Sequence, residues 1–168
     1  MKRMYNNVME IRKLKKENMK EIMALYADIK TNSHTFWEDD YPNEEIVNFD
    51  IERNGLYGGY ENGRLVAICF AGQRCEDGEE NFTWKQPFKK RASFARIGVS
   101  PSMQRHGFAT QMLEYVFDDL RKQGFDGVRI LVERHNEKAK NLYHKFGFEN
   151  VGETERYGHE FYLYEMKL

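Results

Sequence analysis

The sequence has no long apolar segment, and this absence limits where the protein can act. Its longest uninterrupted apolar run covers residues 65–71, far short of the ~20 residues that a membrane-spanning helix needs. The charged stretch at residues 1–16 has no apolar core of the kind that a secretory signal contains. We therefore expect a cytoplasmic protein that is neither exported nor bound to a membrane.

The sequence also has few cysteines and prolines, and its positive and negative charges nearly balance. The two cysteines, Cys69 and Cys75, have neither CxxC spacing nor neighbours that could complete a metal cluster, so we expect no metal site. Three prolines and 13 glycines are too few for a low-complexity or collagen-like chain. The net charge of −1 gives no attraction to phosphate backbones, so no nucleic-acid partner is expected.

The residues that are present are typical of one globular domain. Charged residues make up 32% of the 168 positions, and the 14% that are aromatic are too many for a disordered segment. A chain of this length buries roughly 70% of its unfolded surface, which is enough for a stable core. Because no repeat, linker or shift in composition interrupts it, we predict a single domain over residues 1–168.

The N-terminal half alternates between strand and helix patterns. A strand is predicted at 8–14, and a helix at 19–29, where apolar residues recur every three or four positions. After a polar and aromatic loop, a second helix is expected to begin at Pro42 and to end near Gly55.

The dipeptide Asn62-Gly63 predicts a hairpin. It lies between two strand patterns at 56–61 and 64–73, and its residues suit the positive φ angles that a two-residue turn requires. Residues 74–91 are predicted to form a long loop or an extended hairpin tip, followed by a strand at 92–99.

The C-terminal half indicates a helix from Gly107 to Gly124, a strand at 128–132 and a second helix ending at Gly147. A terminal strand is expected at 161–166, with a further strand near Val151. The order predicts an α/β (α+β) mixed sheet with an antiparallel N-terminal part, a parallel βαβ crossover and helices on both faces. A doubly wound Rossmann sheet fits this order poorly.

Residues 96–109 run from a strand through a turn into a helix N-terminus, where anions bind. Free backbone N–H groups and the positive end of the helix dipole can hold a pyrophosphate without a metal or a lysine. Gly107 allows close approach to the backbone, and the small Ala109 keeps the turn open. The sequence contains no GxxxxGK[ST] and no GxGxxG, which argues against an ATPase and a dinucleotide enzyme.

Two motifs carry a resemblance to a known family. Gln104-x-x-Gly107-x-Ala109 resembles the [Gln/Arg]-x-x-Gly-x-[Gly/Ala] acyl-CoA loop of the N-acetyltransferase superfamily called GNAT. Downstream, the chain carries that superfamily's second pattern: Asn136-x-x-Ala139-x-x-Leu142-Tyr143-x-x-x-Gly147-Phe148. Trp37 and Tyr41-Pro42 also resemble a substrate-side loop of small bacterial members.

The resemblance implies acetyl-CoA as cosubstrate, no metal, and a role for several named residues. Tyr143 would face the thioester sulfur and protonate the departing thiolate, and Trp37 and Tyr41 would contact the acceptor. Asn136 and Tyr143 are seven residues apart, about 20° short of two helical turns, so they share one helix face. The implied cofactor-binding residues are Ile97, Val99, Gln104, Arg105, His106, Gly107, Phe108, Ala109 and Asn136.

Each of these residues also has a simpler interpretation. Tyr143 fits a core aromatic, Asn136 an ordinary helix N-cap, and His106 an exposed turn residue. The charged residues at 133–135 are typical of a surface turn, and the cationic run at 89–91 is either solvated or attracts an acidic substrate.

We predict an N-acetyltransferase that acts on a primary amine, with a small molecule favoured as acceptor. The amine would attack the thioester, and the N–H of Val99 would stabilise the oxyanion of the tetrahedral intermediate. Many members of the family that this chain resembles carry a glutamate, as general base, on the strand before the pyrophosphate loop. In this chain that strand, residues 93–99, contains no carboxylate. Glu38, Asp39 or Asp40 acting through water, or water alone, would then take the proton. A peptide or protein acceptor, a non-catalytic CoA-binding regulator and a homodimer remain open alternatives.

Overall fold

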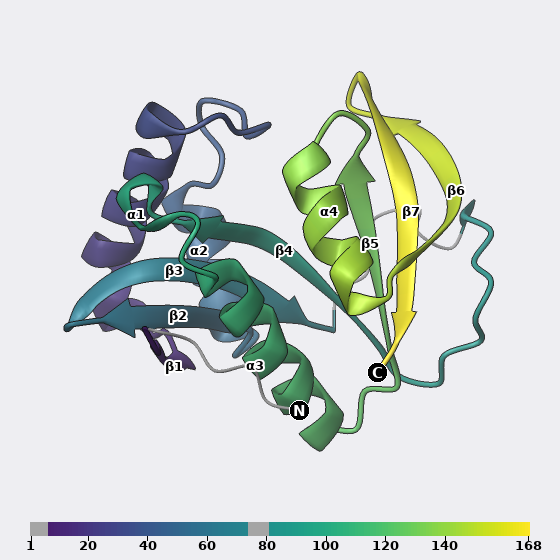
Figure 1. The fold of residues 1–168 in the computed structure, drawn as a ribbon, viewed down its shortest axis with the longest axis horizontal. Coiled ribbons are helices and arrows are strands. Elements are labelled where there is room, and N and C mark those ends of the chain that lie inside the picture. The colour runs from purple at the N-terminus through teal and green to yellow at the C-terminus, as the bar shows by residue number, and fades with distance from the viewer. Residues whose placement is uncertain (1–6, 74–80) are drawn as a thin grey trace. The chain divides into compact units, whose positions relative to one another are not determined.

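The computed structural model describes residues 7–73 and 81–168 and shows a mixed α/β fold, as predicted (Figure 1). The elements are β1 (Glu10–Lys13), α1 (Met19–Asn32), α2 (Glu44–Glu52), β2 (Leu56–Glu61), β3 (Arg64–Gly72), β4 (Arg91–Val99), α3 (Phe108–Lys122), β5 (Gly127–Glu133), α4 (Glu137–Phe146), β6 (Glu149–Arg156) and β7 (His159–Lys167). Short 3-10 turns at Lys16–Asn18 and Pro101–Met103 precede α1 and α3.

The sheet has the strand order β1-β2-β3-β4-β5-β7-β6. The β1–β2 and β2–β3 pairs are antiparallel, and β4–β5 is parallel, so the expected antiparallel part and parallel crossover are confirmed. The chain divides into two compact units, each of which we describe by itself. The first unit comprises Met1–Ala71 and Ala95–Asp118, and the second comprises Gly72–Phe94 and Asp119–Leu168.

In the first unit, helices cover both faces of the sheet. Gly58 and Gly59 are neighbours on β2 and therefore face opposite sides. A Cβ on Gly58 would lie 2.6 Å from Leu14 Cδ2, within the apolar cluster that contains α1 and α2 side chains. A Cβ on Gly59 would meet Met9 Sδ at 2.7 Å and Met112 Cε of α3 at 3.2 Å. The two glycines therefore allow side chains to pack closely against β2 on both faces.

The main core of this unit lies between the sheet and α1. The buried face of α1 is formed by Ile22, Leu25, Tyr26 and Ile29, the spacing expected of an amphipathic helix. The whole cluster consists of Leu14, Ile22, Leu25, Tyr26, Ile29, Val47, Leu56, Tyr60, Leu65, Ile68 and Phe70.

In the first unit, the structure confirms the predicted hairpin and corrects the predicted start of the second helix. Asn62 and Gly63 have φ of +49° and +75°, which confirms the two-residue hairpin. The second helix begins at Glu44 rather than at Pro42, because the Asn43 side chain caps it by accepting a hydrogen bond from Ile46 N at 3.1 Å.

In the second unit, β7 is the central strand of a three-stranded antiparallel arrangement with β5 and β6. The predicted strand near Val151 is β6, which extends over eight residues. Helix α4 ends at Gly147 with φ of +90°, as its sequence predicted.

Part of the predicted loop at 74–91 lies outside the described residues. From residue 82 to residue 90, its described portion contains neither helix nor strand, and it is fixed by two carboxylates. Glu165 accepts hydrogen bonds from the backbone N–H of Lys85 and Gln86, and Asp126 accepts from those of Lys89 and Lys90. The loop therefore has a defined path along the second unit.

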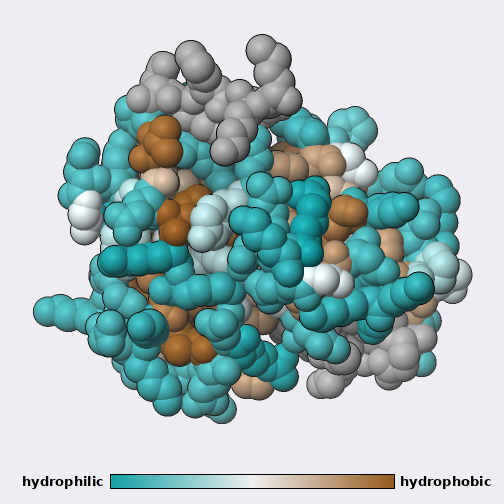
Figure 2. Space-filling view, turned by 90° about the horizontal axis from the view of Figure 1, so that it is seen from below, coloured by the Kyte–Doolittle hydropathy of each residue, from teal (hydrophilic) through white to brown (hydrophobic). Residues whose placement is uncertain are grey.

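The surface of the described residues is largely polar. On the face drawn in Figure 2, apolar residues reach the surface in separate patches among hydrophilic ones. No helix in residues 7–73 and 81–168 is both long and apolar enough to cross a membrane. Within the same ranges, no three His, Cys, Asp or Glu side chains gather as a metal site would need. Cys69 is buried, as expected from its apolar run, whereas Cys75 lies outside the described residues.

Candidate functional site

The turn between β4 and α3 is built from backbone in left-handed conformations. Ser100 anchors its start, because its N–H donates to Val66 O at 2.7 Å and its hydroxyl donates to Asp28 Oδ2 at 2.9 Å. Arg105 and Gly107 then adopt φ of +67° and +80°, which turns the chain into the first residue of α3, Phe108. Glycine adopts this conformation without a steric penalty, so Gly107 suits its position.

Side chains of the turn bond to the turn itself. Gln104 Nε2 donates to Val99 O at 3.3 Å, and His106 Nδ1 lies 2.9 Å from Gln104 O. The His106 ring stacks on Phe108 at a centroid distance of 6.0 Å and is exposed, as predicted. Among the groups of the turn, we therefore consider the backbone N–H groups as the candidate donors to an anion.

The N-terminus of α3 has the electrostatic properties that an anion needs. Gln111 N–H donates to Gly107 O at 3.0 Å, whereas the earlier N–H groups of a helix's first turn have no acceptor within the helix. The positive end of the helix dipole lies at the same place. Residues 104–109 can therefore hold a negatively charged group through the backbone alone.

A second candidate element of the first unit is the loop at residues 33–43, which links α1 to α2. Trp37 packs edge-on against Tyr26 of α1 at a centroid distance of 5.5 Å. It also lies against β4, where a Cβ on Gly98 would come within 3.2 Å of Trp37 Cη2 and 2.6 Å of Ile29 Cδ1. Gly98 thus permits the close approach of Trp37 to β4. The acidic residues of the loop, Glu38 to Asp40, are exposed.

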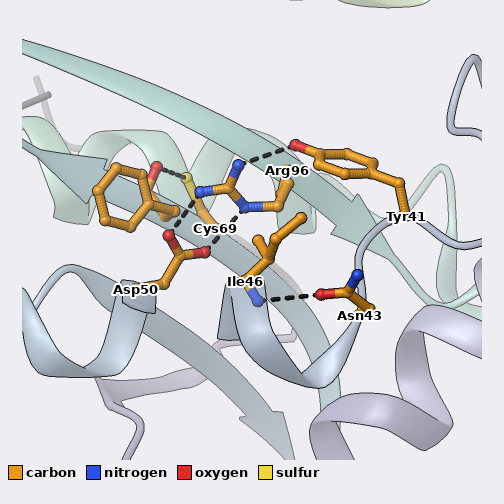
Figure 3. Close-up of polar contacts among 7 residues, drawn as sticks. Tyr41, Asn43, Ile46, Asp50, Cys69 and Arg96 are labelled. Atoms are coloured by element: carbon orange, nitrogen blue, oxygen red, sulfur yellow. Dashed lines mark hydrogen bonds and ion pairs between the residues drawn. The ribbon is translucent and has the colours of Figure 1, made fainter. Parts of the chain in front are cut away.

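A buried ion pair that the sequence did not predict joins α2 to β4, and its arginine also donates a hydrogen bond to the same loop. Arg96 Nε and Nη2 donate to the two carboxylate oxygens of Asp50 at 2.8 and 2.6 Å, and Nη1 donates to Tyr41 Oη at 2.8 Å (Figure 3). The side chains of Arg96 and Asp50 are 2% and 0% exposed. A signal was available in the sequence, because Asp50 interrupts the apolar positions of the second helix.

The surroundings of Arg96 keep its guanidinium in the charged form. Burial by itself lowers the pKa of Arg96, but the neighbouring Tyr41 and Asp50 outweigh it and raise that pKa above its usual value. Nearby, burial raises the pKa of the Cys69 thiol to about 12, and its Sγ contacts Phe70 O at 3.4 Å. Cys69 is therefore a packing residue and not a nucleophile.

In the second unit, Asn136 and Tyr143 lie on α4. Asn136 is the N-cap, with Oδ1 accepting from Ala139 N–H at 3.1 Å, so its capping role is confirmed. Tyr143 is 6% exposed, and its ring packs against Phe94 at 5.1 Å and Phe148 at 5.7 Å. The ring is thus held in a fixed orientation by an aromatic cluster.

The charged residues at 133–135 form the surface turn that the sequence suggested. Glu133 Oε2 accepts from His135 N–H at 2.6 Å, and Arg134 forms an exposed ion pair with Glu160 at 3.0 Å. Lys140 Nζ also donates to Arg134 O. These contacts account for the cluster as local structure.

Comparison with known proteins agrees with this architecture. A sequence profile of the acetyltransferase (GNAT) family matches residues 19–148. An acetyltransferase structure of the GNAT family from Streptococcus agalactiae superposes with a TM-score of 0.80 at 21% identity, covering 95% of each chain. A Salmonella typhimurium structure called a putative acetyltransferase, solved with its cofactor acetyl-CoA, gives a TM-score of 0.72 at 18% identity and covers 95% of this chain and 93% of its own.

Sequence similarity to curated proteins is more local. N-alpha-acetyltransferase 50 of Danio rerio is 34% identical over 70 residues, which are 41% of this chain. The match spans 42% of that relative's length. Because the family profile covers most of the described residues, the chain belongs to the GNAT acetyltransferase family.

Proposed function

We propose that the protein transfers an acetyl group from acetyl-CoA to a primary amine. The observation that carries this proposal is the β4–α3 turn, in which Gln104-x-x-Gly107-x-Ala109 presents backbone N–H groups at the start of α3. Membership of the GNAT family supplies the class of reaction. The family neighbour solved with acetyl-CoA supports the choice of cosubstrate.

The residues present fit acyl-CoA. The turn from Gln104 to Ala109 would bind the pyrophosphate, because its backbone N–H groups and the α3 dipole both favour negative charge. The family motifs assign Ile97 and Val99 to the pantetheine amides through their backbone, and Asn136 to the same arm. Acetyl-CoA would bring the activated thioester, so no metal is required.

The protein's part in the reaction is to stabilise charge and to move protons. The backbone N–H of Val99 would donate to the carbonyl oxygen as negative charge develops on it. The Tyr143 hydroxyl would protonate the departing thiolate, and the ring contacts with Phe94 and Phe148 hold it in one orientation. Both roles remain assignments from the family motifs.

The general base differs from that of many relatives, because β4 carries no carboxylate. The buried Asp50 contacts β4 through Arg96, but both of its oxygens accept hydrogen bonds from that arginine. We propose that the amine gives its proton to water, which passes it to the exposed Glu38, Asp39 or Asp40 or to bulk solvent.

A small amine is the acceptor we favour, because the net charge is near neutral and the loop at 33–43 offers the aromatic residues Trp37 and Tyr41. A peptide N-terminus is the second candidate. The observation in its favour is the 34% identity with N-alpha-acetyltransferase 50 over 70 residues.

Acetyl-CoA binding tests the proposal directly. At a hundredfold excess over its Kd, the cosubstrate should stabilise the native protein by about 2.7 kcal/mol and raise its melting temperature. Gly107→Glu should abolish the shift, because it adds a Cβ and a carboxylate at the turn. Gly63→Glu is the matched control, since Gly63 has nearly the same φ but lies in the β2–β3 hairpin. No shift for the wild-type protein at millimolar acetyl-CoA would reject the proposal.

A further inference from the structure

The buried pair of Arg96 and Asp50 has a geometry that packing alone does not require. Burying two charges costs several kcal/mol of desolvation for each ion, and apolar residues of similar volume are often at least as stabilising. The pair nevertheless forms a two-point contact at 2.6 and 2.8 Å with both side chains out of water. Such a fork fixes the direction of the guanidinium, which leaves Nη1 aimed at one further acceptor.

That further acceptor is the hydroxyl of Tyr41. A tyrosine hydroxyl has one proton to donate and lone pairs that accept. Because Tyr41 Oη accepts from Arg96 Nη1 at 2.8 Å, its own proton is left for another acceptor. Tyr41 is half-buried, and its hydroxyl points toward the guanidinium of Arg96 (Figure 3).

Arg96 also occupies a special place in β4. Its φ of +52° is in the left-handed region, which a residue with a Cβ adopts only at a cost. The residues that follow, Ile97 to Val99, are those the family motifs assign to acyl-CoA. Holding Arg96 by Asp50 therefore fixes a kink in the strand as well as the Tyr41 contact.

The loop is fastened to β4 at a second point, two residues farther along. Trp37 lies against Gly98 and packs on Tyr26, as described above. Within the loop, Tyr41 N–H donates to Glu38 O at 3.0 Å, and Lys30 Nζ donates to Asp39 O at 2.9 Å. The loop thus has two aromatic anchors on one strand, of which the Tyr41 anchor depends on the ion pair.

We propose that Asp50 and Arg96 are positioning residues that aim the Tyr41 hydroxyl at an oxygen of the acceptor. The inference rests on the proposed acetyl transfer and names its substrate class: amines that carry a carbonyl or carboxylate oxygen near the reacting nitrogen, as amino acids and their amides do. A simple alkylamine or diamine offers no oxygen to this hydroxyl and is the poorer acceptor.

The test compares glycinamide with propylamine, which has the same length but no carbonyl oxygen. The proteins are the wild type, Tyr41→Phe, the double variant Asp50→Leu/Arg96→Met and the triple variant. Wild type should prefer glycinamide. Tyr41→Phe and the double variant should each lower the ratio of kcat/KM for glycinamide to that for propylamine by about 10-fold, the value of one well-made hydrogen bond. The triple variant should lose no more than either. Tyr41→Phe, which leaves the ion pair and the β4 kink in place, should not change the KM for acetyl-CoA.

Two results would overturn the positioning role. One is an unchanged glycinamide preference in a folded double variant, and the other is a triple-variant loss equal to the product of the separate losses. A general loss of stability would lower both amines alike and leave the ratio intact, so it cannot imitate the expected result.

A readout without turnover separates this inference from the proposed function. In a Trp84→Phe background, Trp37 is the single tryptophan, and its quenching by acrylamide reports how firmly the loop is held. Quenching should rise in Tyr41→Phe and in the double variant, and unchanged quenching in both would reject the positioning role. If the wild type transfers acetyl to neither amine nor to any other, the proposed function and the substrate class fail together, whereas turnover without discrimination rejects only the inference.

Discussion

The two units each bury an arginine against an acid, and they use the pair differently. In the first unit, Arg96 and Asp50 meet at 2.6 Å and the arginine extends to a loop residue, Tyr41. In the second unit, Arg129 Nε lies 3.7 Å from Glu165 Oε2, and the other Glu165 oxygen accepts two backbone N–H groups. The Arg96–Asp50 pair is a close two-point contact whose arginine also bonds to Tyr41. The Arg129–Glu165 pair is a longer contact between two strands, and its glutamate holds the backbone at residues 85 and 86.

The surroundings of the two arginines support this difference. Arg129 stacks against Trp84 at 4.8 Å and Phe88 at 5.5 Å, and donates to Gln86 O, so all these contacts serve the described portion of the loop at 81–90. Arg96 instead lies in the element that leads into the β4–α3 turn. The remaining donor of Arg96 thus reaches Tyr41, a predicted substrate-side residue, whereas Arg129 donates to the loop at 81–90.

The largest expected effect separates chemistry from packing in the second unit. Tyr143→Phe keeps the ring against Phe94 and Phe148 but removes the hydroxyl, so the fold and acetyl-CoA binding should persist. The value of kcat should fall about 100-fold to 10,000-fold, as expected on losing a general acid. Steady-state kinetics on the preferred amine measures this.

Asn136→Ala provides the contrast on the same helix. It should weaken acetyl-CoA binding and cost about 1 kcal/mol in helix capping, because Asn136 Oδ1 caps Ala139 N–H. For the Tyr143→Phe variant, a kcat equal to that of the wild type would show that Tyr143 is a core aromatic residue and not the general acid.

Breaking the first ion pair from one side should strongly destabilise the protein. Asp50→Leu leaves the Arg96 charge buried without its carboxylate, which should reduce the free energy of unfolding by about 3–5 kcal/mol. Urea denaturation measures the loss. Adding Arg96→Met should recover most of it, since the double variant carries no unpaired charge. A single variant as stable as wild type would show that the pair is not electrostatically coupled.

The looser pair of the second unit should be less sensitive. Glu165→Gln keeps an oxygen for Lys85 and Gln86 N–H but removes the charge opposite Arg129, so a loss of about 1.5 kcal/mol is expected. Glu149→Gln is the matched control, because the Glu149–Lys85 pair is exposed and should be worth less than about 1 kcal/mol. Equal losses from Glu165→Gln and Asp50→Leu would remove the distinction between the two pairs.

The smallest effect is a pH dependence at Asp126. Hydrogen bonds from Lys89 and Lys90 N–H hold the pKa of Asp126 below its usual 3.8. The unfolded chain therefore binds more protons, so this contribution is fully present above pH 3.8 and disappears as the pH falls through the lower folded value. The stability difference between wild type and Asp126→Asn should shrink over that acid range in pH-dependent melting. A constant difference would contradict the assignment.

The sequence predicts best where one local rule decides the structure. The apolar stripe of α3 and the Asn62-Gly63 turn both follow from spacing and backbone preference, and both are present. The start of α2 was misplaced because Asn43 caps the helix and Pro42 only precedes it. The Arg96 kink and its contact with Asp50 join residues 46 positions apart, which no periodic pattern encodes.

The candidate site divides along the same line. The sequence predicts its motif residues, whose binding roles stay predictions, and the capping of α4 by Asn136 is confirmed. That Tyr41 accepts a hydrogen bond from Arg96, by contrast, depends on the strand kink and on the burial of Asp50. Tertiary contacts of this kind had to be seen in three dimensions.

The central claim is acetyl transfer to an amine, and CoA release tests it most directly. Purified protein with acetyl-CoA and a panel of amino acids, amino amides, peptides and polyamines should release CoA steadily with at least one acceptor, well above the rate without protein. Binding of acetyl-CoA without amine-dependent CoA release across the panel would contradict the claim and would favour a CoA-binding regulator on the same fold.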